Sequence, residues 1–312
     1  MIRYTAGRIL AIGPVLFGVS IVVFLLIRLI PGNPAMSILG ERATPELVER
    51  VRNQLGLDLP IWRQYLHFLG NVSRGDFGPS YFYKQEVWTL TLERIPTTLA
   101  LVSYAALIAL VIAMPFATLA AARREGPVDH AIRLLFTGLI GIPTFWMGIV
   151  LALVLSVKLR WLPLGGIGAT RLETLWRLTL PALTIGLHIS PILLRALRSS
   201  LIEVMSSDYV TTGVAMGLRR VTLFVSYLLR NSLTPFISVL GLNIGWLIGG
   251  TIIVEQVFGI PGVGSLLITS ILTRDYSIIQ FVALVLALLV ILVNLLTDLA
   301  YAALDPRVSF RA

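Results

Sequence analysis

The sequence predicts an all-α integral membrane protein with six transmembrane helices. Two observations lead to this prediction: 56% of the 312 residues are apolar while only 13% are charged, and several long apolar runs contain no charge. A bilayer core is roughly 30 Å thick, so about 20 helical residues are needed to cross it. A β-barrel would instead need alternating segments of roughly ten residues. These runs are apolar on every face, which favours helices.

Each predicted span is an apolar run bounded by polar residues. The first is preceded by Arg3 and Arg8 and followed by Arg28 and Pro31 rather than by a small-residue cleavage site, so we interpret it as a retained helix and not a signal peptide. The fourth is short and interrupted by prolines. The predicted spans are residues 9–27, 97–121, 134–157, 179–194, 231–254 and 276–297.

The charge distribution indicates a membrane surface rather than a nucleic-acid partner. The net charge is +9, but the 25 Lys and Arg residues are scattered through the loops between spans and form no single basic face. Six spans place both termini on one side, and Arg3 and Arg8 favour the cytoplasm. The sequence has no cysteine, which excludes disulfides and thiolate metal sites.

The spans divide the chain into four predicted parts. Residues 1–30 are an anchor helix, 31–96 an extracytoplasmic segment, 97–303 a five-helix core with a cytoplasmic loop at 199–232, and 304–312 a cytoplasmic tail. The extracytoplasmic segment is predicted to be structured. Its apolar residues between Leu55 and Leu69 have the spacing of a short amphipathic helix, and a turn is expected at Gly75 to Gly78.

The cytoplasmic loop contains a predicted short helix with a stop signal at each end. Ser207 or Asp208 can cap its start, and Gly217 is placed to end it in a left-handed conformation. Two interpretations stay open on periodicity alone. The helix either docks into a groove of another protein or lies on the lipid surface.

An ordered set of short motifs gives this chain a resemblance to binding-protein-dependent ABC importer permeases of the dipeptide, oligopeptide and nickel branch. The strongest part is Asp208-Tyr209-Val210, followed by Ala215-Met216-Gly217-Leu218 and by Leu229-Arg230-Asn231-Ser232-Leu233-Thr234-Pro235. Further motifs are Pro31-Gly32-Asn33-Pro34, Arg74-Gly75-Asp76-Phe77-Gly78, Glu93-Arg94-Ile95-Pro96, Val254-Glu255-Gln256-Val257-Phe258, Pro261-Gly262-Val263-Gly264, Arg274-Asp275-Tyr276 and Leu304-Asp305-Pro306-Arg307. One departure is Thr211-Thr212-Gly213, where the broader superfamily has Glu-Ala-Ala.

The resemblance implies a type I ABC importer permease fold in a bacterial or archaeal cytoplasmic membrane. It also implies an ATPase-coupling helix formed by Asp208, Tyr209, Val210, Ala215, Met216, Gly217 and Leu218. The implied partners are a second homologous permease, two cytoplasmic P-loop ATPases and an extracytoplasmic solute-binding protein, with no nucleic acid. This chain would hold no cofactor, since ATP and Mg²⁺ would be bound by the ATPases. Peptides are the implied substrate; nickel chelates, heme or other small solutes are the alternatives.

The fifth span carries the residues expected to form the translocation pathway. Gly241, Gly245 and Gly249 recur every four residues and let another helix approach closely. That helix could belong to this subunit or to a second permease beside a shared path, and we favour the shared path. Asn243 is the polar candidate for the pathway. Glu255 is expected to lie exposed at the outer interface.

Other functions fit the sequence less well. An ion-coupled secondary transporter usually carries acids within its spans and two matched halves with broken helices, and neither is visible. His188 is interpreted as an interhelical hydrogen-bonding group, since no carboxylate accompanies it in its span. Enzyme motifs and a Walker sequence are absent, and Lys84 and Lys158 are the only lysines. ATP chemistry therefore belongs to another chain.

Overall fold

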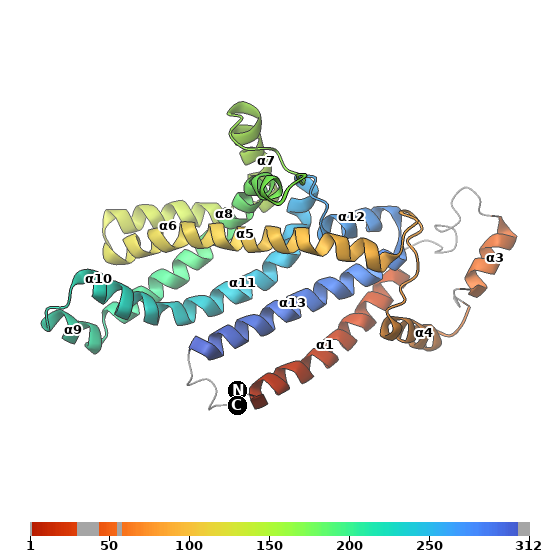
Figure 1. Cartoon of the computed structure of the whole chain (residues 1–312), viewed down its shortest axis with the longest axis horizontal. Helices are drawn as coiled ribbons and strands as arrows, with labels where there is room; N and C mark the ends of the chain where they lie inside the picture. The colour runs from red at the N-terminus through yellow and green to blue at the C-terminus, as the bar shows by residue number, and fades with distance from the viewer. Residues whose placement is uncertain (1, 30–43, 55–57, 305–312) are drawn as a thin grey trace.

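A computed structural model describes residues 2–29, 44–54 and 58–304, and within these ranges the chain is helical. The only extended pairing there is a single bridge between Pro79 and Glu86. Two predicted features, the start of the extracytoplasmic segment at residues 31–43 and the tail from residue 305, lie outside the described residues. The long helices form an elongated bundle with α9 at one end and α12 towards the other (Figure 1).

Four helices in the described residues are long and apolar enough to cross a membrane. They are α5 (Val87–Ala122), α8 (Arg171–Met205), α11 (Arg230–Val257) and α13 (Tyr276–Leu304). The pair formed by α6 (Pro127–Ile140) and α7 (Thr144–Leu151), which continues into the π-helical turn η2 (Ala152–Lys158), makes a fifth if it counts as one span. The first predicted span falls in α1 (Ile2–Leu29), whose describable apolar part, Ile12–Leu25, is shorter. Six spans therefore remain a prediction.

The third predicted span is not one continuous helix. Its two halves, α6 and α7, meet at an angle of 103°. Gly141 ends α6 and Pro143 immediately precedes α7 with a φ of −58°. A proline cannot donate the backbone hydrogen bond that would continue a helix, and it disfavours helical geometry in the residue before it. The run 134–157, predicted as one span, is therefore divided into two helices by a sharp bend, and α7 projects away from the bundle (Figure 1).

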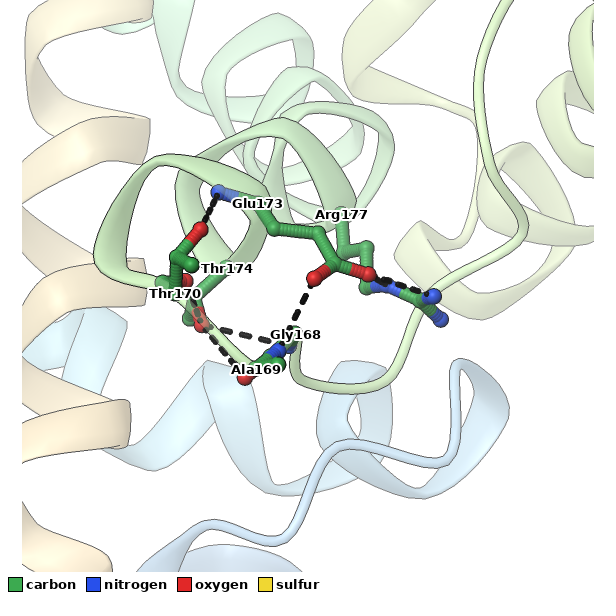
Figure 2. A network of polar contacts seen from close by, with 6 residues as sticks. All are labelled: Gly168, Ala169, Thr170, Glu173, Thr174 and Arg177. Atoms are coloured by element: carbon green, nitrogen blue, oxygen red, sulfur yellow. Dashed lines mark hydrogen bonds and ion pairs between the residues drawn. The ribbon is translucent and has the colours of Figure 1, made fainter.

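The helix that contains the fourth predicted span, α8, is longer than expected, because side chains cap its N-terminus. Thr170 accepts a hydrogen bond from the backbone of Glu173 (3.2 Å), and the Glu173 carboxylate accepts one from the backbone of Ala169 (2.9 Å). Arg177 donates to the same carboxylate at 2.8 Å. Figure 2 shows this network, with Gly168 and Thr174 closing the turn. These partners satisfy free backbone groups, so the helix starts at Arg171 and not near residue 179.

The centre of the bundle is the packing of α5 against α8. Small buried side chains make a stripe along α5 that includes Ala105, Ala109, Ala113 and Ala117. On α8, a side chain added at Gly186 would lie 2.8 Å from Ile108. Because lipid provides no hydrophobic drive between helices, such close backbone approach is how membrane helices gain packing energy. α11 packs on α8, α13 on α11, and α1 on α13.

The amphipathic helix predicted before the second span is present among the described residues. α4 (Ile61–Arg74) follows α3 (Pro45–Gln54), and the expected turn is present, with Gly75 and Gly78 both at φ +71°. The Tyr65 hydroxyl lies 2.8 Å from that of Ser20, and its ring packs edge-on against Phe24. These contacts attach α4 to α1.

At the α12 end of the bundle, two buried carboxylates bind the elements together. Glu255 is fully buried: it accepts hydrogen bonds from the Thr98 hydroxyl (2.6 Å) and from the backbone of Ser265 (2.8 Å) in α12 (Val263–Thr273). The expectation of an exposed Glu255 was wrong, because α12 folds back over it. Asp275 accepts from the Ser80 hydroxyl (2.6 Å) and the Phe82 backbone (3.2 Å), which fixes the loop before α5.

Candidate functional site

The short helix predicted in the loop between the fourth and fifth spans is α9 (Asp208–Ala215). The predicted stop is confirmed: Gly217 has φ +74°, and the backbone amides of Gly217 and Leu218 donate to the carbonyls of Val214 (3.0 Å) and Gly213 (3.1 Å). This pairing is a Schellman motif. The start differs from the prediction, since the Ser207 hydroxyl donates to the Val204 carbonyl (2.6 Å) and no side chain caps the helix.

One face of α9 is attached to the bundle and the other is free. Val210 is buried, and Gly213 is so close to η3 (Leu223–Leu229) that an added side chain would lie 2.9 Å from Leu223. The opposite face carries exposed apolar side chains, with Val214 60% and Met216 69% exposed and Tyr209 also exposed. Apolar exposure on a short, firmly held helix is typical of a surface that inserts into another protein.

α9 is joined to the long helices by short connections and direct contacts. It follows α8 after two residues and contacts both α8 and η3, and η3 continues without a break into α11. A displacement of α9 would therefore be passed to α8 and α11 over short connections. We call α9 the docking helix.

The second feature is a cavity of about 400 Å³ between α7, α8 and α11, here called the membrane cavity. Its polar side chains are Thr144, His188 and Asn243, and its apolar wall includes Trp246, which is 85% exposed. The buried Nδ1 of His188 has no hydrogen-bond partner among the described residues. The Asn243 amide donates to the Val239 carbonyl at 2.7 Å.

The predicted glycine face of α11 divides into two parts. A side chain added at Gly241 would collide with Thr297, and one added at Gly245 would lie 3.0 Å from Asn294, so both glycines pack against α13 of the same chain. The shared-path interpretation was wrong for these two residues, because a backbone approach within the subunit accounts for them. Gly249 is exposed with open space around it, and Asn243 and Gly250 line the membrane cavity.

Comparison with known protein families decides the identity of this arrangement. Residues 113–310 match the model of the binding-protein-dependent transport system inner membrane component, and residues 1–102 match the model of its N-terminal region. The chain belongs to this family of ABC importer permeases. Members are non-catalytic permease subunits in the bacterial inner membrane, so this chain is an inner-membrane subunit of an ABC importer.

Individual relatives cover the whole chain. The glutathione transport system permease proteins GsiC of Escherichia coli K12 and of Shigella dysenteriae serotype 1 are each 36% identical over 312 residues, with 100% of both chains covered. Among solved structures, an inward-facing MetNI methionine ABC transporter matches with a TM-score of 0.59, 16% identity and coverage of 69% of this chain and 96% of that one. An amino acid ABC transporter matches with a TM-score of 0.53 and 14% identity, and the match covers 69% of this chain and 94% of that one. These two similarities show the permease fold.

Sequence reasoning missed several residues of the two sites. Thr144, Ile185 and Trp246 line the membrane cavity, but no motif distinguishes them from ordinary apolar-span residues. A usable signal was the recurrence of large apolar side chains on one face of α11, at Leu242, Trp246 and Ile253, all of which are exposed.

Proposed function

We propose that this permease forms half of a translocation pathway for dipeptides or oligopeptides, which an extracytoplasmic solute-binding protein delivers. The relatives that cover its full length are named for the transport of glutathione, a tripeptide. The membrane cavity supports the proposal through its chemistry: an amide at Asn243 and an imidazole at His188 can hydrogen-bond peptide groups, and the surrounding wall is apolar. Selection among peptides would rest mainly with the binding protein.

The observation that carries the proposal is the docking helix. Tyr209, Val214 and Met216 form an exposed apolar tip on a helix that is fixed to α8 and, through η3, to α11. α8 and α11 are also the main walls of the membrane cavity. A partner that holds this tip and changes shape would therefore change the cavity. Two cytoplasmic P-loop ATPases, which bind ATP and Mg²⁺, fit this role.

The transport cycle then follows from differential binding. Closure of the ATPase pair on ATP would pull the docking helices of two permeases together and favour a pathway open to the outside. Hydrolysis would release them and restore the inward-open state. Such a shift requires that ATP bind one state of the complex more tightly than the other. Both termini of this chain would lie in the cytoplasm, on the same side as α9.

A secondary transporter is the alternative class of function. Such a transporter usually carries an acidic side chain in its pathway for ion coupling. Among the described residues that line the membrane cavity there is no carboxylate, and its polar groups are a threonine, a histidine and an asparagine. The geometry therefore favours transport driven by a partner over transport driven by an ion gradient.

The test is uptake into proteoliposomes that contain this permease with its copurifying chains and binding protein. We expect ATP-dependent uptake of glutathione or of a longer peptide, with no uptake of a nickel chelate or heme.

Gly217→Val should uncouple ATP hydrolysis from uptake, because a β-branched residue at φ +74° distorts the helix end. Gly217→Asn, which tolerates that conformation, is the matched control. ATP-independent uptake driven by an ion gradient would overturn the proposal.

A further inference from the structure

A second, smaller cavity of about 270 Å³ lies between α6 and α8, here called the arginine cavity. Its polar lining consists of the side chains of Arg133, Arg195 and Arg198 together with Thr137. Phe136 and Pro191 are among the remaining lining residues, and both are buried. Of the described residues that line it, none is a carboxylate. The cavity is therefore basic, with an apolar base.

Among the residues that the structure describes, only Arg198 of these three arginines forms an ion pair. Arg198 donates to both oxygens of Asp129, at 2.7 and 2.5 Å, and the Asp129 side chain is fully buried. Arg133 contacts a nitrogen of His130 at 3.4 Å and interacts electrostatically with Asp129, whose single negative charge is already paired with Arg198. Arg195 is exposed and has no hydrogen bond or ion pair to any residue that the structure describes. The pair Arg133 and Arg195 is thus available to an anion.

The position of these two arginines indicates the depth of the cavity in the membrane. Arg133 directly precedes the apolar run that begins at Leu134, and Arg195 directly follows the apolar run that ends at Leu194. Both therefore lie at the same boundary between polar and apolar residues. Next to Arg133 on α6, Leu134 is 77% exposed and Leu135 is 61% exposed. A ligand bound in this cavity would contact two guanidinium groups and an apolar surface together.

We propose that the arginine cavity binds the phosphate of an anionic phospholipid, such as phosphatidylglycerol or cardiolipin. Arg133 and Arg195 hold the headgroup phosphate, and the acyl chains lie along the exposed apolar face of α6. Arginine suits this role, since its planar fork matches two phosphate oxygens and stays charged at the membrane surface. Basic pockets between membrane helices are suited to such headgroups. A free phosphate ion would use the same arginines but would leave the apolar surface uncovered.

The experiment uses the full-length chain, with any chains that copurify, in a neutral detergent. Phosphatidylglycerol and phosphatidylcholine with matched acyl chains are titrated, and bound lipid is counted by native mass spectrometry. The test variant is Arg133→Gln with Arg195→Gln, which leaves the Arg198–Asp129 pair intact. The matched control is Arg123→Gln with Arg124→Gln, which removes two exposed charges from the loop before α6 without touching the cavity.

We expect the unmodified chain to bind phosphatidylglycerol at least tenfold more tightly than phosphatidylcholine. The double variant should lose roughly tenfold or more of that affinity, and the control should stay within about twofold. Millimolar inorganic phosphate should not displace the lipid. Equal binding of the two lipids, or unchanged binding by the double variant, would overturn the proposal. Displacement by inorganic phosphate alone would also overturn it, in favour of a site for a free anion.

Discussion

The two ends of the bundle are built in opposite ways. At the α12 end, Glu255 and Asp275 are buried, and their carboxylates accept hydrogen bonds from Thr98, Ser265, Ser80 and Phe82 of the same chain. At the α9 end, Tyr209, Val214 and Met216 expose apolar surface. The two carboxylates at the α12 end find their hydrogen-bond donors within the chain, whereas the α9 end leaves apolar surface exposed, and we propose that a partner docks there. The comparison separates residues that hold the fold from residues that act through another chain.

The largest effect on stability is expected from Glu255→Leu. The Thr98 hydroxyl and the Ser265 amide would lose their acceptor inside a buried site, which costs about 3 kcal/mol or more of the free energy of unfolding. Reversible unfolding of the detergent-solubilised protein measures this loss. Gln256→Leu changes the exposed neighbour and should have little effect. Equal free energies of unfolding for the two variants would show that the buried carboxylate does not stabilise the fold.

A smaller and more local effect is expected from Asp275→Ala. The loop that carries Ser80 and Phe82 would lose its acceptor, and α13 would lose the contact from the Ile278 amide. We expect a loss of about 2 kcal/mol in the free energy of unfolding. Backbone hydrogen exchange should rise in residues 79–86. The control is Glu86→Ala, which removes an exposed carboxylate from the same loop, and a rise of the same size there would contradict the account.

The glycines of α11 test which helix faces are internal. Gly241→Val should destabilise the protein by about 1–3 kcal/mol, because the added side chain collides with Thr297 on α13. Gly249→Val meets open space and should leave the fold unchanged. Unfolding of the two variants under identical conditions gives the comparison. If Gly249→Val were the more damaging change, the assignment of these two faces would be wrong.

The sequence predicts the helices well where hydropathy alone decides. The predicted spans at 97–121, 231–254 and 276–297 fall inside α5, α11 and α13. The docking helix was also predictable, because Gly217 is a local stop signal whose φ of +74° the structure confirms. Local signals of this kind need no knowledge of the fold.

The rest depends on residues far apart in the chain. Thr98 and Glu255 are 157 positions apart, so no local pattern could show that α12 buries the carboxylate. The 103° break after α6 was available in principle from Gly141 and Pro143, but proline is common in membrane helices and does not by itself specify a bend. The packing of Gly241 could not be predicted either, because its neighbour Thr297 lies on another helix, far along the chain.

The smallest effect on stability and the largest on coupling are expected at the tip of the docking helix. Val214→Ser and Met216→Ser should change the free energy of unfolding by less than about 0.5 kcal/mol, since both side chains are exposed. ATP-driven uptake should nevertheless fall severalfold, because the apolar anchors for the ATPase are lost. Normal uptake in this double variant would show that the apolar tip of α9 is not needed for coupling.

The central claim, that α9 docks on an ATPase, can be tested directly by cross-linking. The natural sequence contains no cysteine, so Met216→Cys introduces a single reactive thiol at an exposed position of the tip, and Leu272→Cys does so at the α12 end. A photoactivatable cross-linker is attached to each variant in native membranes, and adducts are identified by mass spectrometry. We predict a P-loop ATPase chain in the adduct of Met216→Cys and none with Leu272→Cys. An adduct of Met216→Cys with lipid only, in membranes that contain the ATPase, would contradict the account.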